Sequence, residues 1–198
     1  MTKARSQGSI TVRPATPARW PDLESVFNAR GCSLARGCWC MYYRRSGAYE
    51  PPRGKSRSQG NRAALKALVE AGPPPGLIAY RGATPVGWVS LGPREDYRKL
   101  ERSPVMRPVD GEPAWSIVCF VVPAEFRGQG VAAALLDAAV KYAKKRGARL
   151  VEAYPVDKRG RLADDTLWFG AKSMYDDAGF TEVARRKPHR PVVRLKVA

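Results

Sequence analysis

The sequence lacks the features of a membrane protein and of a disulfide-rich secreted scaffold. No run of about 20 apolar residues could span a bilayer, and residues 1–8 hold no apolar core of the kind found in signal peptides. Only 4 cysteines occur among 198 residues, which in an intracellular protein indicates reduced thiols. We therefore expect a soluble cytoplasmic protein, with a flexible tail at residues 1–8 and a single domain at residues 9–198.

Acidic residues and histidine are scarce. Lys and Arg total 35 against 18 Asp and Glu, which gives a formal net charge of +17, and His189 is the only histidine. This charge favours an acidic partner, and nucleic acid is one candidate. However, the basic residues are spread along the chain, and no helix-turn-helix, zinc-finger or RNA-binding motif is present. A basic surface that attracts an anionic cofactor is therefore the preferred interpretation over direct binding of nucleic acid.

Three of the cysteines lie close together without forming a metal motif. Cys32, Cys38 and Cys40 have no fourth ligand nearby, and their Cys-x-Cys spacing departs from the Cys-x-x-Cys pair of zinc sites. We predict no metal. Residues 31–49 are rich in aromatic side chains, and we interpret them as a partly buried flap that lines a substrate pocket.

The stretch 115–147 predicts a strand, a glycine-rich turn and a helix. Residues 115–122 are uncharged and dominated by β-branched and aromatic side chains, as in a strand buried on both faces. From Val131 the apolar positions recur every three or four residues, and Gly147 is a suitable helix stop.

The turn before this helix is suited to phosphate. The first backbone N–H groups of a helix lack intrahelical partners and favour anions. Gly128 and Gly130 have no side chain to keep a phosphate away from the backbone, and Arg127 adds a fixed positive charge.

Three motifs compete for such a turn. The P-loop of nucleotide triphosphatases is excluded because no Gly-Lys-Ser/Thr ending is present. The dinucleotide fingerprint matches formally as Gly128-x-Gly130-x-x-Ala133, with Glu152 at a suitable distance to hold a ribose. Against it, several residues separate the strand end near Val122 from Gly128, whereas the dinucleotide turn follows its strand almost at once. A dinucleotide enzyme is thus a distant alternative.

The third motif is Arg/Gln-x-x-Gly-x-Gly/Ala after a Val-rich strand, and Arg127, Gly130 and Ala132 match it. An aromatic residue followed by three residues and Gly-Phe occurs downstream as Tyr175-Asp-Asp-Ala-Gly-Phe180. With both motifs in this order, the chain resembles the GNAT superfamily of N-acetyltransferases from residue 9 to residue 197.

The resemblance implies an α/β (α+β) fold of the GNAT type, with a mixed, mostly antiparallel central sheet flanked by helices. It implies acetyl-coenzyme A as co-substrate and an amine as acceptor, attacked directly through a tetrahedral intermediate. The backbone at the end of the central strand would pair with the pantetheine arm, with a donor near Val121 or Val122 for the oxyanion, and the turn would hold the pyrophosphate. The cofactor-binding residues implied are Phe120, Val121, Val122, Arg127, Gly128, Gln129, Gly130, Val131 and Ala132.

Tyr175 occupies the family position of the general acid, which would protonate the leaving thiolate. An ordinary phenol with a pKa near about 10 stays protonated at neutral pH, as this role requires. No general base can be assigned, since residues 115–122 contain no carboxylate. Four carboxylates are candidates by chain position only, and we expect each to be a solvated loop charge: Glu95, Asp96, Asp110 and Glu112. Some relatives have an Asn seven residues before the tyrosine, where this chain has Trp168. A non-catalytic protein of the same fold that binds coenzyme A or nucleic acid is the alternative, and the sequence leaves the acceptor and the oligomeric state open.

Local patterns predict the remaining elements. In chain order these are a first strand at residues 8–16, a helix capped by Thr16, a surface loop at 50–60, a helix capped by Asn61, a hairpin at 75–91, a polar segment at 95–113, a strand at 149–154, a charged loop at 157–165, a helix at 172–178 and a closing hairpin at 181–197.

Overall fold

The computed structural model describes residues 9–157 and 168–197. The tail predicted at residues 1–8 and nearly all of the loop predicted at 157–165 lie outside the described residues. No helix in the described ranges is long and apolar enough to cross a membrane.

A seven-stranded sheet forms the centre of the molecule, in the order β1-β2-β3-β4-β5-β7-β6. Only β4 and β5 run parallel to each other, and the other neighbours are antiparallel. The predicted mixed, mostly antiparallel α+β sheet is therefore confirmed. The strands are β1 (Ile10–Pro14), β2 (Gly76–Arg81), β3 (Thr84–Pro93), β4 (Trp115–Val121), β5 (Leu150–Ala153), β6 (Thr181–Arg185) and β7 (Pro191–Lys196).

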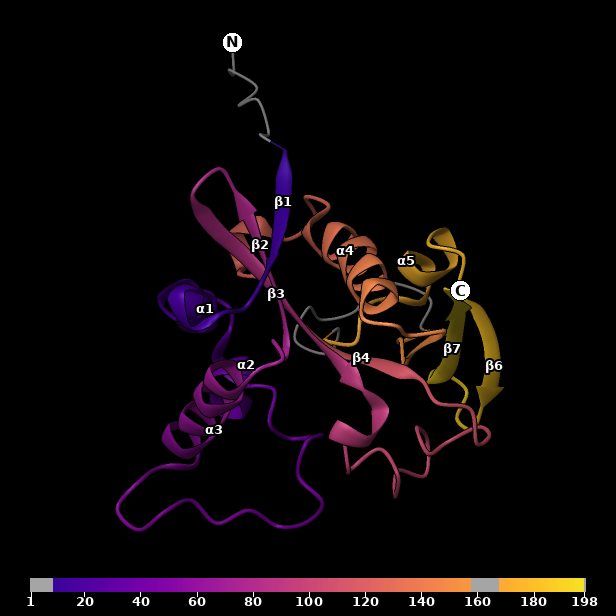
Figure 1. Ribbon diagram of the computed structural model, residues 1–198, viewed down its shortest axis with the longest axis horizontal. Coiled ribbons are helices and arrows are strands. Elements are labelled where there is room, and N and C mark those ends of the chain that lie inside the picture. The colour runs from indigo at the N-terminus through magenta and orange to yellow at the C-terminus, as the bar shows by residue number, and fades with distance from the viewer. Residues whose placement is uncertain (1–8, 158–167, 198) are drawn as a thin grey trace.

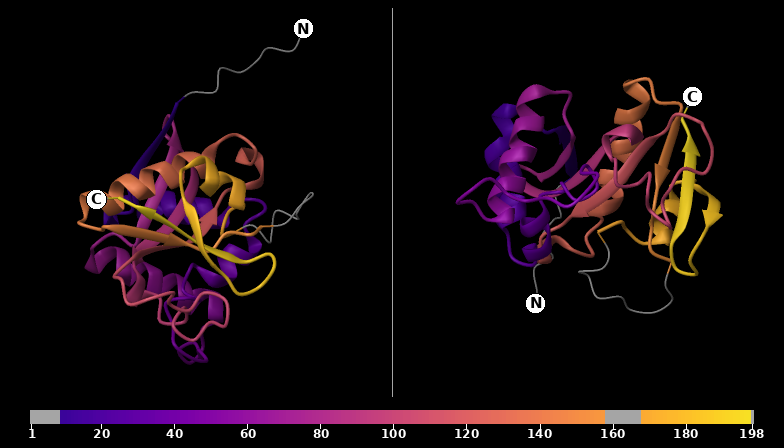
Figure 2. Two further views of the ribbon diagram at one scale, coloured as in Figure 1. Left: turned by 90° about the vertical axis from the view of Figure 1, so that its right-hand side faces the viewer. Right: turned by 90° about the horizontal axis from the view of Figure 1, so that it is seen from below.

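Helices cover both faces of this sheet (Figures 1 and 2). On one side lie α1, α2 and α3, and on the other lie α4 and α5. The helices are α1 (Trp20–Asn28), α2 (Ser33–Cys38), α3 (Arg57–Ala71), α4 (Val131–Lys145) and α5 (Lys172–Asp177), with short 3-10 turns η1 (Pro17–Arg19), η2 (Arg94–Asp96) and η3 (Ala124–Phe126).

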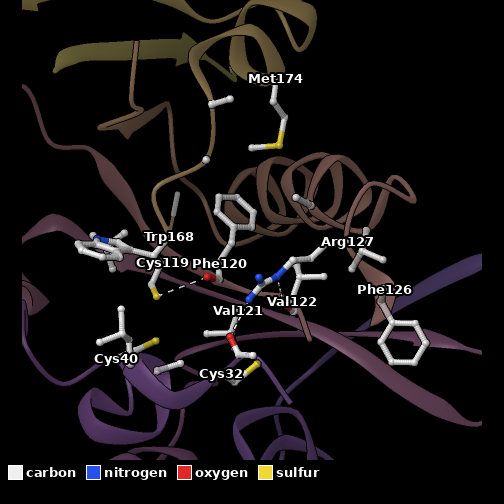
Figure 3. Close-up of a pocket in the computed structure, with 18 of the residues that line it drawn as sticks. Cys32, Cys40, Cys119, Phe120, Val121, Val122, Phe126, Arg127, Trp168 and Met174 are labelled. Carbon is white, nitrogen blue, oxygen red and sulfur yellow. Dashed lines mark hydrogen bonds between the residues drawn. The ribbon is translucent and has the colours of Figure 1, made fainter. Parts of the chain in front are cut away.

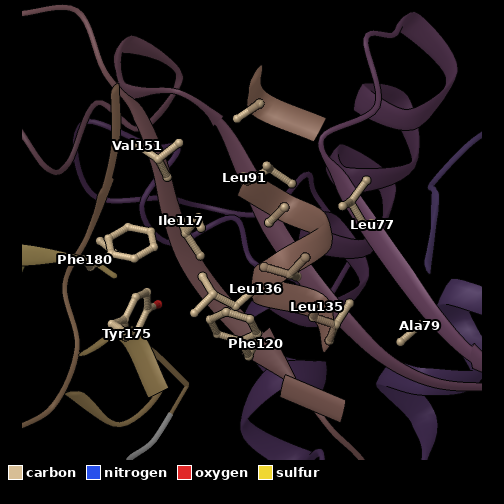
Figure 4. Close-up of a cluster of buried hydrophobic side chains, with 14 of the residues drawn as sticks. Leu77, Ala79, Leu91, Ile117, Phe120, Leu135, Leu136, Val151, Tyr175 and Phe180 are labelled. Carbon is tan, nitrogen blue, oxygen red and sulfur yellow. The ribbon is translucent and has the colours of Figure 1, made fainter. Parts of the chain in front are cut away.

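Alternation along β2 shows why two layers of helices are needed. Leu77 and Ala79 pack in the cluster that contains Leu135 of α4, part of which is drawn in Figure 4. Ile78 and Tyr80 pack in the cluster that contains Leu23 of α1. Because successive residues of a strand point to opposite faces, a strand that is apolar at every position must be covered on both sides.

The start of α3 differs from the prediction. The helix begins at Arg57, inside the segment predicted as a loop, because Ser56 and Gln59 form a capping box: Ser56 Oγ accepts from the Gln59 N–H, and Gln59 Oε1 accepts from the Ser56 N–H. Asn61 is therefore not the cap, and its side chain donates to the Gly37 carbonyl at the end of α2.

Thr16 has the predicted N-cap position with Pro17 after it, but at the start of a 3-10 turn and not of an α-helix. Its side chain makes no capping hydrogen bond to the backbone and accepts from Arg19 instead. Pro17 opens the 3-10 turn η1, and α1 begins only at Trp20.

The segment between β3 and β4, predicted as polar, contains a third apolar cluster. Tyr97 and Leu100 are fully buried and pack with Tyr154, which directly follows β5, and with Phe169. This segment thus covers the part of the sheet that the helices leave open.

Candidate active site

A cavity of about 730 Å³ lies along the end of β4 (Figure 3). Four parts of the chain line it: α2 with the residues that follow it, β4, the turn that leads into α4, and the segment that leads into α5. Its size is typical of small-molecule sites, which measure about 300–1,000 Å³. Of the nine residues expected to bind the cofactor, only Gln129 is not among those that line the cavity.

The cavity exists because β4 and β5 separate. The two strands pair only between Trp115–Ile117 and Val151–Ala153. Further along β4, the Phe120 N–H donates instead to the carbonyl of Trp168, at 2.6 Å. The last residues of β4 therefore have one side paired with β3 and the other side turned toward the cavity.

A β-bulge marks the point where the strands part. Cys119 pairs with Ser90 of β3 and Ile117 pairs with Leu91, so Val118 is an extra residue on β4. A bulge bends its strand and increases the local twist, which is consistent with β4 turning away from β5 here.

The direction of the backbone decides which amide groups face the cavity. Neighbouring residues of a strand turn their N–H groups to opposite sides. Since Phe120 turns toward Trp168, Val121 turns toward its partner Trp88 on β3. Val122 turns to the same side as Phe120. Of the two donors expected near the oxyanion, Val122 is thus on the cavity side and Val121 is within the sheet.

The turn before α4 brings a helix N-terminus to the cavity. Gly130 precedes the helix with φ of 78°, a left-handed conformation that glycine adopts without strain. Gly128, Gly130 and the first three residues of α4 line the cavity. The orphan N–H groups of the first turn therefore border a space that an anion can occupy.

Arg127 and Gln129 hold this turn in place. Arg127 Nε donates to the Val122 carbonyl at 3.0 Å, and Nη2 donates to the Gly31 carbonyl at 2.6 Å, so the guanidinium links the end of β4 to the loop before α2. Gln129 accepts from Arg81 and donates to the Glu125 carbonyl. The Gln129 side chain is therefore occupied away from the cavity, whereas the charge of Arg127 remains at its wall.

The structure does not bring the Tyr175 hydroxyl into the cavity. Tyr175 is fully buried beside Phe120 and Phe180 (Figure 4), and its hydroxyl donates to the Phe169 carbonyl at 2.8 Å. Burial raises the pKa of this phenol well above its ordinary value. Met174, its neighbour, does line the cavity.

Cysteines from distant parts of the sequence meet at the cavity wall. Cys38 ends α2, Cys40 follows it, Cys119 lies on β4, and all three line the cavity with Cys32. A hydrogen bond with Cys40, together with burial, raises the pKa of Cys119 well above 9. Burial beside Cys40 raises the pKa of Cys38 to about 11. These thiols are therefore protonated at neutral pH, and no disulfide joins the four cysteines.

The backbone is strained where it presents Cys40. Trp39 and Cys40 have φ of 48° and 51°, a conformation that side chains other than glycine seldom adopt. Packing maintains it, because Trp39 is buried and stacks on Phe27 with ring centroids 4.5 Å apart. The sequence prediction of an aromatic segment at residues 31–49 thus corresponds to a short helix followed by a strained, buried turn.

Sequence reasoning missed a buried charged network between β4, β5 and β7. Glu152 is fully buried and accepts from Arg94 and, at 2.8 Å, from Arg194. Arg194 also pairs with Asp110, which is an exposed loop residue, as expected. Tyr154 donates to Glu152 and lies 3.0 Å from Ser116 of β4. A glutamate inside an apolar run was the signal, since a buried carboxylate requires a cation.

The carboxylates considered as bases by chain position do not reach the cavity. Glu95, Asp96, Asp110 and Glu112 are absent from its lining, and the only charged side chain among the described lining residues is Arg127. In the described part of the chain, no group of three or more His, Cys, Asp or Glu side chains is suited to a metal ion.

Comparisons with known proteins agree with this geometry. A model of the acetyltransferase (GNAT) family matches residues 40–161, which include β4 and α4. No curated protein sequence matches the chain.

Solved structures share the fold at low sequence identity. A mosquito arylalkylamine N-acetyltransferase like 5b is 15% identical with a TM-score of 0.58, and the match covers 95% of this chain and 100% of that one. A polyamine N-acetyltransferase of Drosophila melanogaster, which catalyses the formation of N-acetylagmatine, is 13% identical with a TM-score of 0.55 over 95% and 100% of the two chains. The Salmonella typhimurium protein yncA, solved with its cofactor acetyl-CoA, is 16% identical with a TM-score of 0.52 over 96% and 95%.

Proposed function

Since the chain belongs to the GNAT family of acetyltransferases, we propose that residues 9–198 form one N-acetyltransferase domain that moves an acetyl group from acetyl-CoA to an amine on a small molecule or a protein. The amine attacks directly, through a tetrahedral intermediate. One observation carries the proposal: the glycine turn at the N-terminus of α4 and the open side of β4 border the same cavity.

The two parts of the cavity fit the two parts of the co-substrate. The amides of residues 127–132 would bind the pyrophosphate, because helix N-termini favour anions. The N–H groups of Phe120 and Val122 would pair with the pantetheine arm and the thioester oxygen, as an added strand pairs with a sheet edge. For this, the Trp168 carbonyl must give up the Phe120 N–H. Bound acetyl-CoA supplies the thioester carbon on which the amine acts.

Tyr175 remains the proposed proton donor to the leaving thiolate. Its raised pKa keeps the phenol protonated at neutral pH, as a general acid requires. The role also requires that the hydroxyl exchange the Phe169 carbonyl for the sulfur. This would require a movement of α5, whose Met174 already lines the cavity.

The test is release of free thiol from acetyl-CoA across a panel of amines, together with calorimetric binding of CoA. Amine-dependent release, with CoA binding that is competitive with acetyl-CoA, supports the proposal. Binding of CoA without turnover on any amine would favour the non-catalytic alternative. Steeply salt-dependent binding of DNA or RNA, with no CoA binding, would favour a nucleic-acid protein on the same fold.

A further inference from the structure

Exposed apolar side chains form a rim of the cavity. Among the described residues, the large hydrophobic side chains that are well exposed are Leu34 (58%), Tyr42 (54%), Trp168 (39%) and Val183 (39%). The first three all line the cavity. Scattered exposed hydrophobic residues are normal, but a cluster around one cavity marks a binding surface.

These three residues come from separate segments around the cavity. Leu34 lies on α2, Tyr42 follows it, and Trp168 precedes α5. In Figure 3, Trp168 lies beside Cys119 and Cys40, on the side away from Phe126 and the turn. None of the three is among residues 127–132, which are proposed to bind the pyrophosphate.

Two positively charged side chains lie against aromatic rings that line the cavity or adjoin its lining. Lys99 Nζ lies 3.6 Å from the centroid of the Tyr42 ring. The Arg190 guanidinium lies 4.5 Å from the centroid of the Phe169 ring, which in turn packs on Tyr43. Among the described residues that line the cavity, the one charged side chain is also a cation. An acceptor with several positive charges would meet repulsion here and no countercharge.

We propose that the acceptor is a monoamine carried on an aromatic body, and that Leu34, Tyr42 and Trp168 bind that body. The inference rests on the proposed function and adds the class of acceptor to it. An aromatic ring gains from burial against the apolar rim and from stacking on Tyr42 or Trp168. A polyamine gains neither and adds a second positive charge to a cationic surrounding.

The experiment compares 2-phenylethylamine with 1,4-diaminobutane at saturating acetyl-CoA. We expect kcat/KM to be at least about 10-fold higher for the aromatic amine, since apolar complementarity of this kind gives about 10- to 200-fold discrimination. Trp168→Ala and Tyr42→Ala should each reduce kcat/KM for 2-phenylethylamine by about 10-fold and leave CoA binding unchanged. Leu34→Glu should raise kcat/KM for the diamine a few-fold, because it supplies a countercharge at the rim.

Val183→Ala is the matched control. Val183 lies on β6, is as exposed as Trp168, and does not line the cavity, so its replacement should leave both amines unaffected. CoA binding by each variant shows that the fold is retained.

The outcomes separate this inference from the proposed function. Equal or better turnover of 1,4-diaminobutane would overturn the inference and keep the acetyltransferase. If no amine is turned over, but 2-phenylethylamine binds to the CoA complex of the wild type and not to that of Trp168→Ala, the aromatic site is supported and the proposed acetyl transfer is refuted. Neither binding nor turnover of 2-phenylethylamine would overturn the inference.

Discussion

Replacing the glycine at either end of α4 by alanine distinguishes an effect on phosphate binding from an effect of backbone strain. Gly130 and Gly147 precede and follow the helix with φ of 78° and 85°, and a Cβ at either position would meet no atom within 4 Å. Alanine in this conformation costs about 1–2 kcal/mol. Gly130→Ala and Gly147→Ala should therefore lower the free energy of unfolding by similar amounts, without steric overlap.

Only one of the two methyl groups would enter the cavity. Gly130 lines it, whereas Gly147 lies a full helix length away. Loss of a single hydrogen bond to a charged group costs about 1.5–3 kcal/mol, which weakens binding about 10- to 100-fold. We expect Gly130→Ala to raise the Kd for CoA by this factor, and Gly147→Ala to change it less than about 2-fold.

The assay is urea unfolding with and without CoA, supported by calorimetric titration. At a CoA concentration of about 100 times the wild-type Kd, the ligand should stabilise the wild type and Gly147→Ala by about 2.7 kcal/mol. A 30-fold weaker Kd leaves about 0.9 kcal/mol for Gly130→Ala at the same concentration. Equal CoA stabilisation of both variants would refute phosphate binding at this turn, and unchanged stability of both would refute the left-handed geometry.

Three further changes test the site and its support. Tyr175→Phe removes the donor to the buried Phe169 carbonyl, so the free energy of unfolding should fall by about 1–3 kcal/mol. If Tyr175 is the general acid, kcat should also fall about 100-fold while CoA binding is unchanged. A loss of stability with unchanged kcat would show that the residue is purely structural. Glu152→Gln should cost about 3–5 kcal/mol in urea unfolding because it removes the fully buried anion between two guanidinium groups, whose remaining partners are exposed. Glu182→Gln at the surface should cost less than about 1 kcal/mol, and equal losses would contradict the network. Because burial raises the pKa of Cys38 from 9.0 to about 11, the unfolded chain releases this proton first as pH rises, and the stability that this thiol contributes below pH 9 is lost above it. Other buried thiols and phenols lose stability in the same range, so the measurement is the difference between two proteins: between pH 8 and pH 10.5 the wild type should lose about 2 kcal/mol more than Cys38→Ala. Equal losses in the two proteins would refute the burial of this thiol.

Local patterns were sufficient where one element determines its own structure. The run at residues 115–122, the glycine turn and the periodicity from Val131 predicted β4, the turn and α4, because each depends on neighbours in the sequence. The same holds for the hairpin of β2 and β3. The start of α3 is also determined locally, by the capping box of Ser56 and Gln59. It was not predicted because the surrounding residues are basic and rich in proline and glycine, which is typical of a loop.

Side-chain partners that are distant in the sequence could not be predicted. Glu152 of β5 contacts Arg94 of η2 and Arg194 of β7, and no local sequence pattern predicts such contacts. The meeting of Cys40 with Cys119 is of the same kind. A motif likewise places Tyr175 on its helix but does not say where the hydroxyl points.

The candidate site depends on departures from regular structure that the rest of the fold must stabilise. Val118 interrupts the β3–β4 ladder, Gly130 is left-handed, and Trp39 and Cys40 adopt a strained conformation. Each unfavourable backbone conformation costs about 1–3 kcal/mol and persists only where packing leaves no alternative. Here the fully buried Glu152 network fixes β4 to β5 just before they part, and the stack of Phe27 on Trp39 fixes the turn that carries Cys40. Loss of either support should therefore open the cavity wall before the sheet itself unfolds.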